Sequence, residues 1–204
     1  MIRLWLIRHG QTPGNRVGRY IGTTDESLSE SGRSFLEKLN YPKPDAVYVS
    51  PMRRCTETAD ILFPGMAMRI IEELSECDFG DFENKNYKEL SGNEDYQRWI
   101  DSQGTLPFPN GESREAFRYR SLKGFQLAAA SCIRHEYKSA ALVIHGGTIM
   151  NIMEEYADRE RAFYDWHVGN GGGFEVELDP KLWTSGRREL ILCSSVLDDY
   201  RKNG

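Results

Sequence analysis

Two histidines in this sequence directly follow apolar segments, and each stands just before a glycine. His9 follows Leu4-Trp5-Leu6-Ile7-Arg8, and His145 follows Leu142-Val143-Ile144. Short apolar runs of this kind are typical of strands buried on both faces of a sheet. In open α/β sheets, ligands bind beyond the carboxyl ends of the strands. We therefore expect a shared site in which His9 attacks phosphorus and His145 binds the transferring group.

Phosphoryl transfer also needs cations around the phosphate oxygens and an acid for the leaving oxygen. Arg8 and Arg54 offer permanent charge and planar N–H donors, and Asn15 is predicted to add an uncharged amide donor. Glu76 is the predicted acid, because it lies in an apolar, glycine-containing segment where burial would raise its pKa. His9 would form a phosphohistidine, and Glu76 would protonate the leaving alkoxide and then activate water. This mechanism requires no metal and no cofactor.

Several residues remain open for the same roles. Arg53 is the alternative to Arg54, and three nearby carboxylates are alternatives to Glu76, namely Asp78, Asp81 and Glu83. His135 and His167 are expected to be structural or surface residues. Histidine pairs at metal-binding spacing and paired cysteines are both missing from the sequence, so we predict no metal site.

Composition narrows the class of protein. The 204 residues, with 39% hydrophobic and 28% charged residues, predict one folded domain over residues 1–204. A formal net charge of −5 disfavours nucleic acid and anionic membranes as partners, which leaves a small phosphate ester bound by a local cluster. Four scattered cysteines and the lack of a signal peptide or long apolar run predict a cytoplasmic protein. The oligomeric state is not predicted.

Apolar runs and helical patterns alternate along the chain. Strands are expected at residues 3–7, 46–49, 140–144, 173–178 and 189–194. This alternation predicts an α/β/α three-layer sandwich around a mainly parallel sheet. Ser50 is expected to cap the helix that follows residues 46–49, with Pro51 in its first turn. Residues 83–112, polar and interrupted by prolines, predict a small inserted cap with a short helix near 94–101, and a long helix is expected over 113–137.

Five segments, taken in order, resemble the motifs of the histidine phosphatase superfamily, which is phosphoglycerate mutase-like in fold. They are Arg8-His9-Gly10-Gln11-Thr12, residues 50–59, residues 74–83, Asn110-Gly111-Glu112-Ser113 and His145-Gly146-Gly147. The resemblance covers almost the whole chain. It implies hydrolysis of a phosphomonoester through a phosphohistidine, assigns the phosphate to Arg54, and places Gly146 and Glu112 among the substrate-binding residues.

Residues 19–28 are similar to a loop of bacterial α-ribazole phosphatases of the cobalamin pathway. This similarity implies α-ribazole 5′-phosphate as substrate, with Gly22 and Thr23 in contact with it. Phosphoglycerate mutases carry a longer insertion, substrate-carboxylate arginines that are not found here, and usually a hydroxyl residue in place of Ile21. The alternatives are a phosphoglycerate mutase, a broad-specificity sugar or nucleotide phosphatase and, in another class, a phosphate-ligand binding protein without turnover.

The expected cap is rich in aromatic residues. They would either stack on a flat heterocycle or pack the cap itself, and they are Tyr87, Tyr96, Trp99 and Phe108. The substrate therefore depends on side-chain positions that the sequence does not give.

Overall fold

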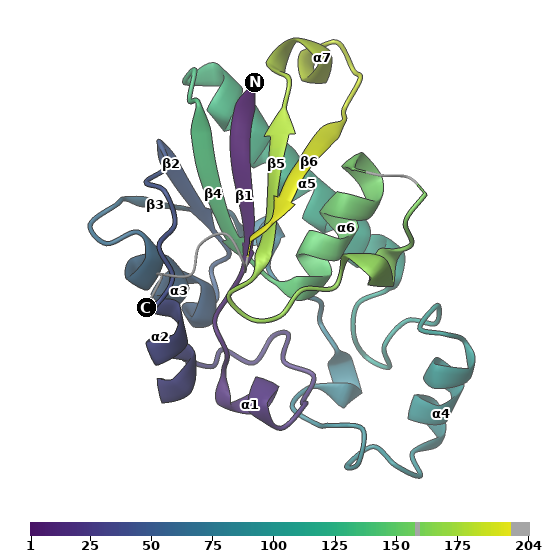
Figure 1. Cartoon of the computed structure of the whole chain (residues 1–204). Coiled ribbons are helices and arrows are strands. Elements are labelled where there is room, and N and C mark those ends of the chain that lie inside the picture. The colour runs from purple at the N-terminus through teal and green to yellow at the C-terminus, as the bar shows by residue number, and fades with distance from the viewer. Residues whose placement is uncertain (158–159, 197–204) are drawn as a thin grey trace.

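A mixed sheet forms the centre of the protein (Figure 1). The computed structural model describes residues 1–157 and 160–196, and within them the sheet has six strands in the order β3-β2-β4-β1-β5-β6. The strands are β1 (Ile2–Arg8), β2 (Ala46–Val49), β3 (Met68–Ile70), β4 (Ser139–Ile144), β5 (Gly173–Leu178) and β6 (Leu190–Ser195). Neighbours from β3 to β1 pair in parallel, whereas β5 is antiparallel to both β1 and β6. The expected mainly parallel sheet is therefore confirmed.

Strand β3 was not predicted from the sequence. It is a three-residue edge strand that is partly exposed, and its residues Met68-Arg69-Ile70 do not form an apolar run. An edge strand gains its hydrogen bonds from one neighbour, here β2, so its sequence needs little hydrophobic signal. The five predicted strands are all present, with β6 placed one residue later than expected.

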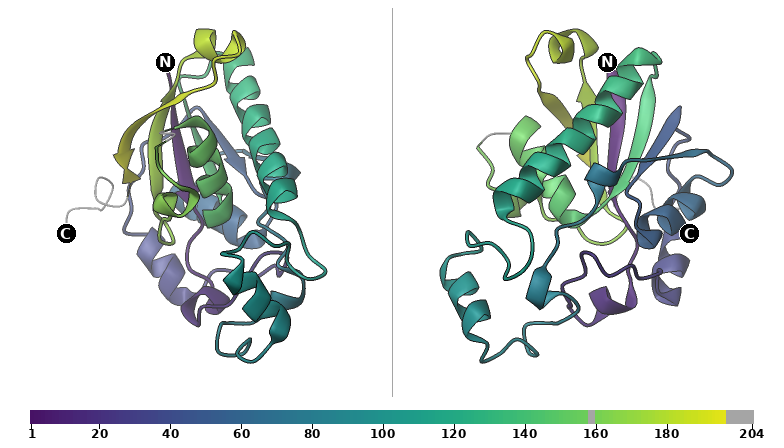
Figure 2. Two further views of the ribbon diagram at one scale, coloured as in Figure 1. Left: turned by 90° about the vertical axis from the view of Figure 1, so that its right-hand side faces the viewer. Right: turned by 180° about the vertical axis from the view of Figure 1, so that it is seen from behind.

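Helices cover both faces of the sheet, as the two views in Figure 2 show. Side chains alternate along β1, so Leu6 packs in one apolar cluster with residues of two helices, and Ile7 packs in a second cluster on the opposite face. The first cluster includes residues of α5 (Arg114–Arg134) and α6 (Gly146–Tyr156), and the second includes residues of α2 (Glu30–Leu36) and α3 (Arg53–Leu62). This arrangement confirms the three-layer fold.

The start of α3 differs from the prediction. The helix begins at Arg53, and its N-terminal neighbour Met52 makes no side-chain cap. A distant residue does so instead, because Asp25 Oδ1 accepts the Arg53 N–H at 2.7 Å. The prediction that Ser50 is the N-cap was wrong, because that position is Met52. Ser50 Oγ accepts the Met52 N–H at 3.4 Å, just before the helix, and it also lies 2.7 Å from His145 Nε2.

Residues 83–112, called the cap segment below, lie beyond the carboxyl end of β1 (Figure 1). They contain α4 (Glu94–Asp101) and contribute no strand to the described sheet. Three aromatic rings of this segment pack together, with Tyr96 stacked on Trp99 at 6.2 Å and Trp99 beside Phe108 at 5.1 Å. The long helix expected after the segment is α5, which ends at residue 134 rather than 137.

The remaining helices are short. They are α1 (Pro13–Arg16), α7 (Pro180–Thr184) and the 3-10 turns η1 (Glu72–Leu74), η2 (Gly80–Phe82) and η3 (Phe163–Trp166). Of the helices within the described ranges, not one has the length and apolar character to span a membrane. The single domain predicted over 1–204 includes residues 158–159 and 197–204, which lie outside the described residues, and it stays a prediction.

Candidate active site

The sheet brings the two strand-end histidines together. Strands β1 and β4 are parallel neighbours with Arg8 opposite Ile144, so the residues that follow them emerge side by side. The ring centroids of His9 and His145 are 5.2 Å apart, and the two residues are only 4% and 0% exposed. Parallel pairing thus produces a buried histidine pair at the carboxyl edge of the sheet.

One ring nitrogen of His9 is fixed by its own loop. Nδ1 lies 2.7 Å from the Gly10 carbonyl oxygen, which can only accept, so Nδ1 carries the proton and donates it. This tautomer leaves a lone pair on Nε2. Burial, followed by the charges of Arg54 and Arg8, holds the pKa of His9 well below its ordinary value. His9 is therefore a neutral imidazole with one nitrogen free for attack.

His145 contacts residues from the start of α3. Its Nε2 lies 2.7 Å from Ser50 Oγ and 3.5 Å from Cys55 Sγ. Burial first, and then the charge of Arg54, lowers the pKa of His145 well below its ordinary value. Burial raises the pKa of Cys55 to about 12, so this sulfur stays a neutral thiol. The ring is neutral and bordered by a hydroxyl and a thiol.

Two guanidinium groups flank the histidines, of which Arg54 is fully buried and Arg8 is largely buried. Arg54 is fully buried, and its Nη1 and Nη2 donate to the carbonyls of Thr24 and Gly22, each at 2.8 Å. Arg8 Nη1 donates to the Val168 carbonyl at 2.6 Å. The Nε of both arginines is buried and has no acceptor among the described residues. Backbone carbonyls therefore orient each guanidinium group, and its Nε–H remains available to donate to an anion.

Arg53, the alternative to Arg54, lies elsewhere. Its side chain is 62% exposed and contacts Glu57 at 3.9 Å, one helical turn away. Of the two neighbouring arginines, the structure brings only Arg54 to the histidines.

Glu76 contacts the chain just after His145, at Gly147. Its Oε1 accepts the Cys77 N–H at 3.0 Å, and its Oε2 accepts the Gly147 N–H at 3.3 Å. Burial raises the pKa of this carboxyl, although these N–H groups and the charge of Arg54 oppose the shift. A carboxyl whose protonated form is favoured is suited to act as a general acid.

The three carboxylates that were alternatives to Glu76 all accept hydrogen bonds from other residues of the protein. Asp78 accepts the Gly80 N–H at 2.9 Å, and Asp81 accepts the Asn110 amide at 2.9 Å. Glu83 Oε1 accepts the backbone N–H groups of Gly22 and Thr24, at 2.8 and 2.9 Å. Of the four acidic residues, only Glu76 lines the cavity described below.

Asn15 is oriented by two donors. Its Oδ1 accepts the Thr12 N–H at 3.3 Å and the Asn170 side-chain amide at 3.1 Å, which leaves its Nδ2 as the group for a ligand. Asn170 also donates to the His9 carbonyl at 3.2 Å. The sequence reasoning missed Asn170, although the run Gly169-Asn170-Gly171-Gly172 directly before β5 was an available signal of a tight functional loop.

Two of the predicted substrate-binding residues, Gly22 and Glu112, make hydrogen bonds or ion pairs within the protein. The Gly22 N–H and carbonyl are bound by Glu83 and Arg54, and a methyl group at Gly22 would lie 1.8 Å from the Cys77 carbonyl oxygen. Glu112 forms an ion pair with Arg120 at 2.7 Å. The polar groups of both residues therefore have protein partners in this structure. Substrate contact stays a prediction for Gly22 and Glu112.

Gly146 is buried at the start of α6, whereas Thr23 is exposed. Gly146 begins α6 against the Arg8 guanidinium, where an added methyl group would lie 3.4 Å from Nε. Thr23 is exposed on the loop held by Arg54. Substrate contact stays a prediction for both residues.

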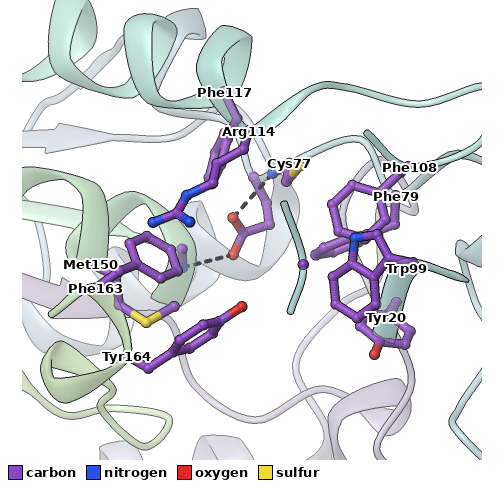
Figure 3. Close-up of a pocket in the computed structure, with 13 residues that line it drawn as sticks. Tyr20, Cys77, Phe79, Trp99, Phe108, Arg114, Phe117, Met150, Phe163 and Tyr164 are labelled. Atoms are coloured by element: carbon purple, nitrogen blue, oxygen red, sulfur yellow. Dashed lines mark hydrogen bonds between the residues drawn. The ribbon is translucent and has the colours of Figure 1, made fainter. Parts of the chain in front are cut away.

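A cavity of about 230 Å³ opens beside Glu76 (Figure 3). Phe163, Tyr164, Met150 and Arg114 form one side, and the opposite side is aromatic, comprising Phe79, Phe108, Trp99 and Tyr20. Of the aromatic residues expected in the cap, Trp99 and Phe108 line the cavity, Tyr96 packs behind Trp99, and Tyr87 is exposed. Phe163, Tyr164 and Arg114 were missed, because they stand outside every recognised motif. Such a cavity can hold a flat apolar group attached to a phosphate.

Among residues 1–157 and 160–196, groups of three or more His, Cys, Asp or Glu side chains arranged to hold a metal ion are not found.

Comparison with known proteins shows the family of the chain. A family model of the histidine phosphatase superfamily (branch 1) matches residues 4–189. The adenosylcobalamin/alpha-ribazole phosphatase of Escherichia coli is 30% identical over 90% of this chain and 93% of its own length. Phosphoserine phosphatase 1 of Hydrogenobacter thermophilus is 30% identical over 71% of each chain. The crystal structure of the alpha-ribazole phosphatase from Shigella flexneri superposes with a TM-score of 0.79, at 26% identity and 96% coverage of both chains.

The matched region contains both histidines, both buried arginines and Glu76, on a phosphoglycerate mutase-like fold. The chain therefore belongs to the histidine phosphatase superfamily.

Proposed function

We propose that this protein is a phosphomonoesterase that hydrolyses α-ribazole 5′-phosphate through a phosphohistidine on His9. The observation that carries the substrate class is the aromatic cavity beside Glu76, which matches a flat, apolar base on the leaving group. The relatives named alpha-ribazole phosphatase support the same choice.

In the first step, His9 Nε2 attacks phosphorus in line with the ester oxygen. The donors of Arg8, Arg54 and Asn15 bind the phosphate oxygens, and His145 adds a neutral contact. The P–O bond to the leaving group breaks as the P–N bond forms. Glu76 transfers its proton to the leaving alkoxide, consistent with the burial that raises its pKa.

In the second step, Glu76 is a carboxylate. It accepts a proton from water as that water attacks the phosphohistidine, and the P–N bond breaks to release phosphate and His9. Side chains supply the nucleophile, the acid–base group and the phosphate donors, and water is the second nucleophile, so we propose that turnover needs no metal ion. Activity retained in excess chelator would support this, and activity restored only by an added divalent cation would contradict it.

The test of the substrate is kcat/KM for α-ribazole 5′-phosphate beside O-phosphoserine, 3-phosphoglycerate and a generic aryl phosphate. A preference of a hundredfold or more, about 2.7 kcal/mol of transition-state binding, is expected for the heterocyclic ester. Equal and low values on all four substrates would contradict the assignment to α-ribazole 5′-phosphate.

Phosphoserine is the second candidate substrate. Arg114 supplies a cation in the cavity, which is where the carboxylate of phosphoserine would find a partner. The phosphoserine phosphatase of Hydrogenobacter thermophilus also supports this candidate. We favour the heterocycle because aromatic side chains dominate the cavity and Arg114 already lies 3.7 Å from Glu154.

Two further hypotheses, a phosphoglycerate mutase and a non-catalytic binding protein, predict different products from those of a phosphatase. A phosphoglycerate mutase would move phosphate between hydroxyl groups with little release to water. A non-catalytic binding protein would bind the ester and release no phosphate. Measuring inorganic phosphate release alongside ester binding separates both from a phosphatase. A cytoplasmic location stays a prediction from the sequence.

A further inference from the structure

One arginine outside the site holds the backbone that carries Glu76. Arg120 lies on α5, and its Nη1 donates to the carbonyls of Glu73 at 3.1 Å and Ser75 at 2.8 Å. Its Nη2 donates to the Glu76 carbonyl at 3.1 Å. A single guanidinium group therefore fixes the chain just before the predicted acid.

The remaining donors of Arg120 bind Glu112. Nε donates to Oε1 at 3.0 Å and Nη2 donates to Oε2 at 2.7 Å, a two-point pairing of guanidinium and carboxylate. All five N–H groups of Arg120 consequently have an acceptor. The two side chains are largely shielded, with 27% and 16% exposure.

Glu112 also fixes the chain just after Glu76. The Glu112 N–H donates to the Asp78 carbonyl at 2.9 Å, and its Oε2 accepts the Asp78 N–H at 3.4 Å. Residues on both sides of the acid are thus bound by one ion pair, which connects α5 to the end of the cap segment.

We propose that Arg120 and Glu112 are positioning residues that set the place of the Glu76 carboxyl relative to the ester oxygen. This inference rests on the proposed function, in which Glu76 is the acid. The hydrogen bonds of the pair go to the Glu76 segment and not to Arg8, Arg54 or His145, and the charge of Arg120 is the smallest of the causes that lower the pKa of His145. Loss of the pair therefore impairs proton delivery more than phosphate binding.

The leaving group separates these two effects. An alkyl phosphate releases an alkoxide that must be protonated, whereas 4-nitrophenyl phosphate releases a stable phenolate that needs little help from an acid. We measure kcat/KM for both esters in Arg120→Lys, since lysine keeps the charge but offers three donors without the planar fork. The alkyl ester is expected to lose at least about tenfold more activity than the aryl ester.

Arg118→Lys is the matched control, because Arg118 lies on the same helix and pairs with Glu155, away from the Glu76 segment. It should leave both esters near wild type. Glu112→Gln is the second variant, which decides the question should Arg120→Lys fail to fold, and it should show the same bias against the alkyl ester.

Glu76→Gln is the reference, with the largest difference between the two esters. Should Glu76→Gln show this difference while Arg120→Lys and Glu112→Gln lower both esters equally, the positioning inference is overturned and the proposed function stands. Should Glu76→Gln itself lower both esters equally, Glu76 is not the acid and the proposed function fails.

Discussion

The His9 imidazole combines a fixed tautomer with a low pKa, and both follow from its surroundings. The Gly10 carbonyl holds the proton on Nδ1, and burial keeps the ring neutral. We expect His9→Ala to lower kcat/KM by about four orders of magnitude or more, as loss of a covalent nucleophile does elsewhere.

His135→Ala is the control, since that exposed histidine lies at the end of α5. Mass spectrometry at alkaline pH, where phosphohistidine survives, should find the phosphoryl group on His9 in the wild type. Near-normal turnover by His9→Ala would refute the phosphohistidine mechanism.

The depressed histidine pKa values also predict how stability changes with pH. Below about pH 6.5 the unfolded chain protonates His9 and His145, while the folded protein keeps them neutral. The unfolded state then binds more protons, so the free energy of unfolding falls as the pH falls, by up to about 1.4 kcal/mol per pH unit for each group.

Glu76 has the opposite effect on the free energy of unfolding. Its raised pKa means that the folded state binds a proton more readily than the unfolded state as the pH falls. The comparison is therefore made in Glu76→Gln, with and without His145→Gln, by following Tm from pH 7.5 to 5. The histidine substitution should flatten the decline in Tm. An unchanged slope would mean that His145 titrates normally in the folded protein.

At the scale of elements, close packing of two loops places Arg54. The loop at Gly22 packs closely against the Cys77 carbonyl. Glu83 accepts the Gly22 N–H, and Arg54 donates to the Gly22 carbonyl. Gly22→Ala must push these backbones apart, so we expect a loss of about 1–3 kcal/mol or more, together with reduced kcat/KM. Urea unfolding measures the first effect. Gly169→Ala is the control, because a methyl group there meets open space, and equal stability of the two variants would contradict the argument.

Much of the framework was predictable because its signals are local. Apolar runs located five strands, and strand ends followed by histidine and glycine located the reacting edge. Strand β3 was not predicted, because this partly exposed edge strand has no apolar run. The contact of Ser50 with His145 and the ion pair of Glu112 with Arg120 were not predicted, since both join residues far apart in the sequence or in different elements. Local sequence carries no information on such contacts.

At the scale of the molecule, the cavity is assembled from parts far apart in the chain. Its two sides come from α5, α6 and η3 on one hand, and from the cap segment with the chain near Tyr20 and Phe79 on the other (Figure 3). Sequence patterns predicted the cap segment and the long helix, but neither η3 nor the way in which these parts enclose a cavity. Substrate choice is therefore a property of how the cap segment meets the α/β fold.

The aromatic side of the cavity, which includes Trp99, is predicted to recognise the base of the substrate, and substitution of Trp99 tests this role. We expect Trp99→Ala to lower kcat/KM for α-ribazole 5′-phosphate by about tenfold or more, because a stacked aromatic contact is worth on the order of 1 kcal/mol beyond its buried area. A small alkyl phosphate should be affected much less. Tyr87→Ala is the control, since this exposed ring lies in the same segment. An equal loss on both esters would assign Trp99 to folding of the cap segment rather than to recognition.

The Nε groups of Arg8 and Arg54, buried without an acceptor in the described part of the chain, have a further consequence. Any tetrahedral oxyanion satisfies them, and inorganic phosphate is the last product to leave. Bound phosphate should raise Tm, by the equivalent of about 2.7 kcal/mol at a hundred times its Kd, and an unchanged Tm would contradict this reading. In the proposed cycle, the donors that bind the transferring phosphate also bind the phosphate product, so we expect product inhibition and a rate that depends on the surrounding phosphate concentration.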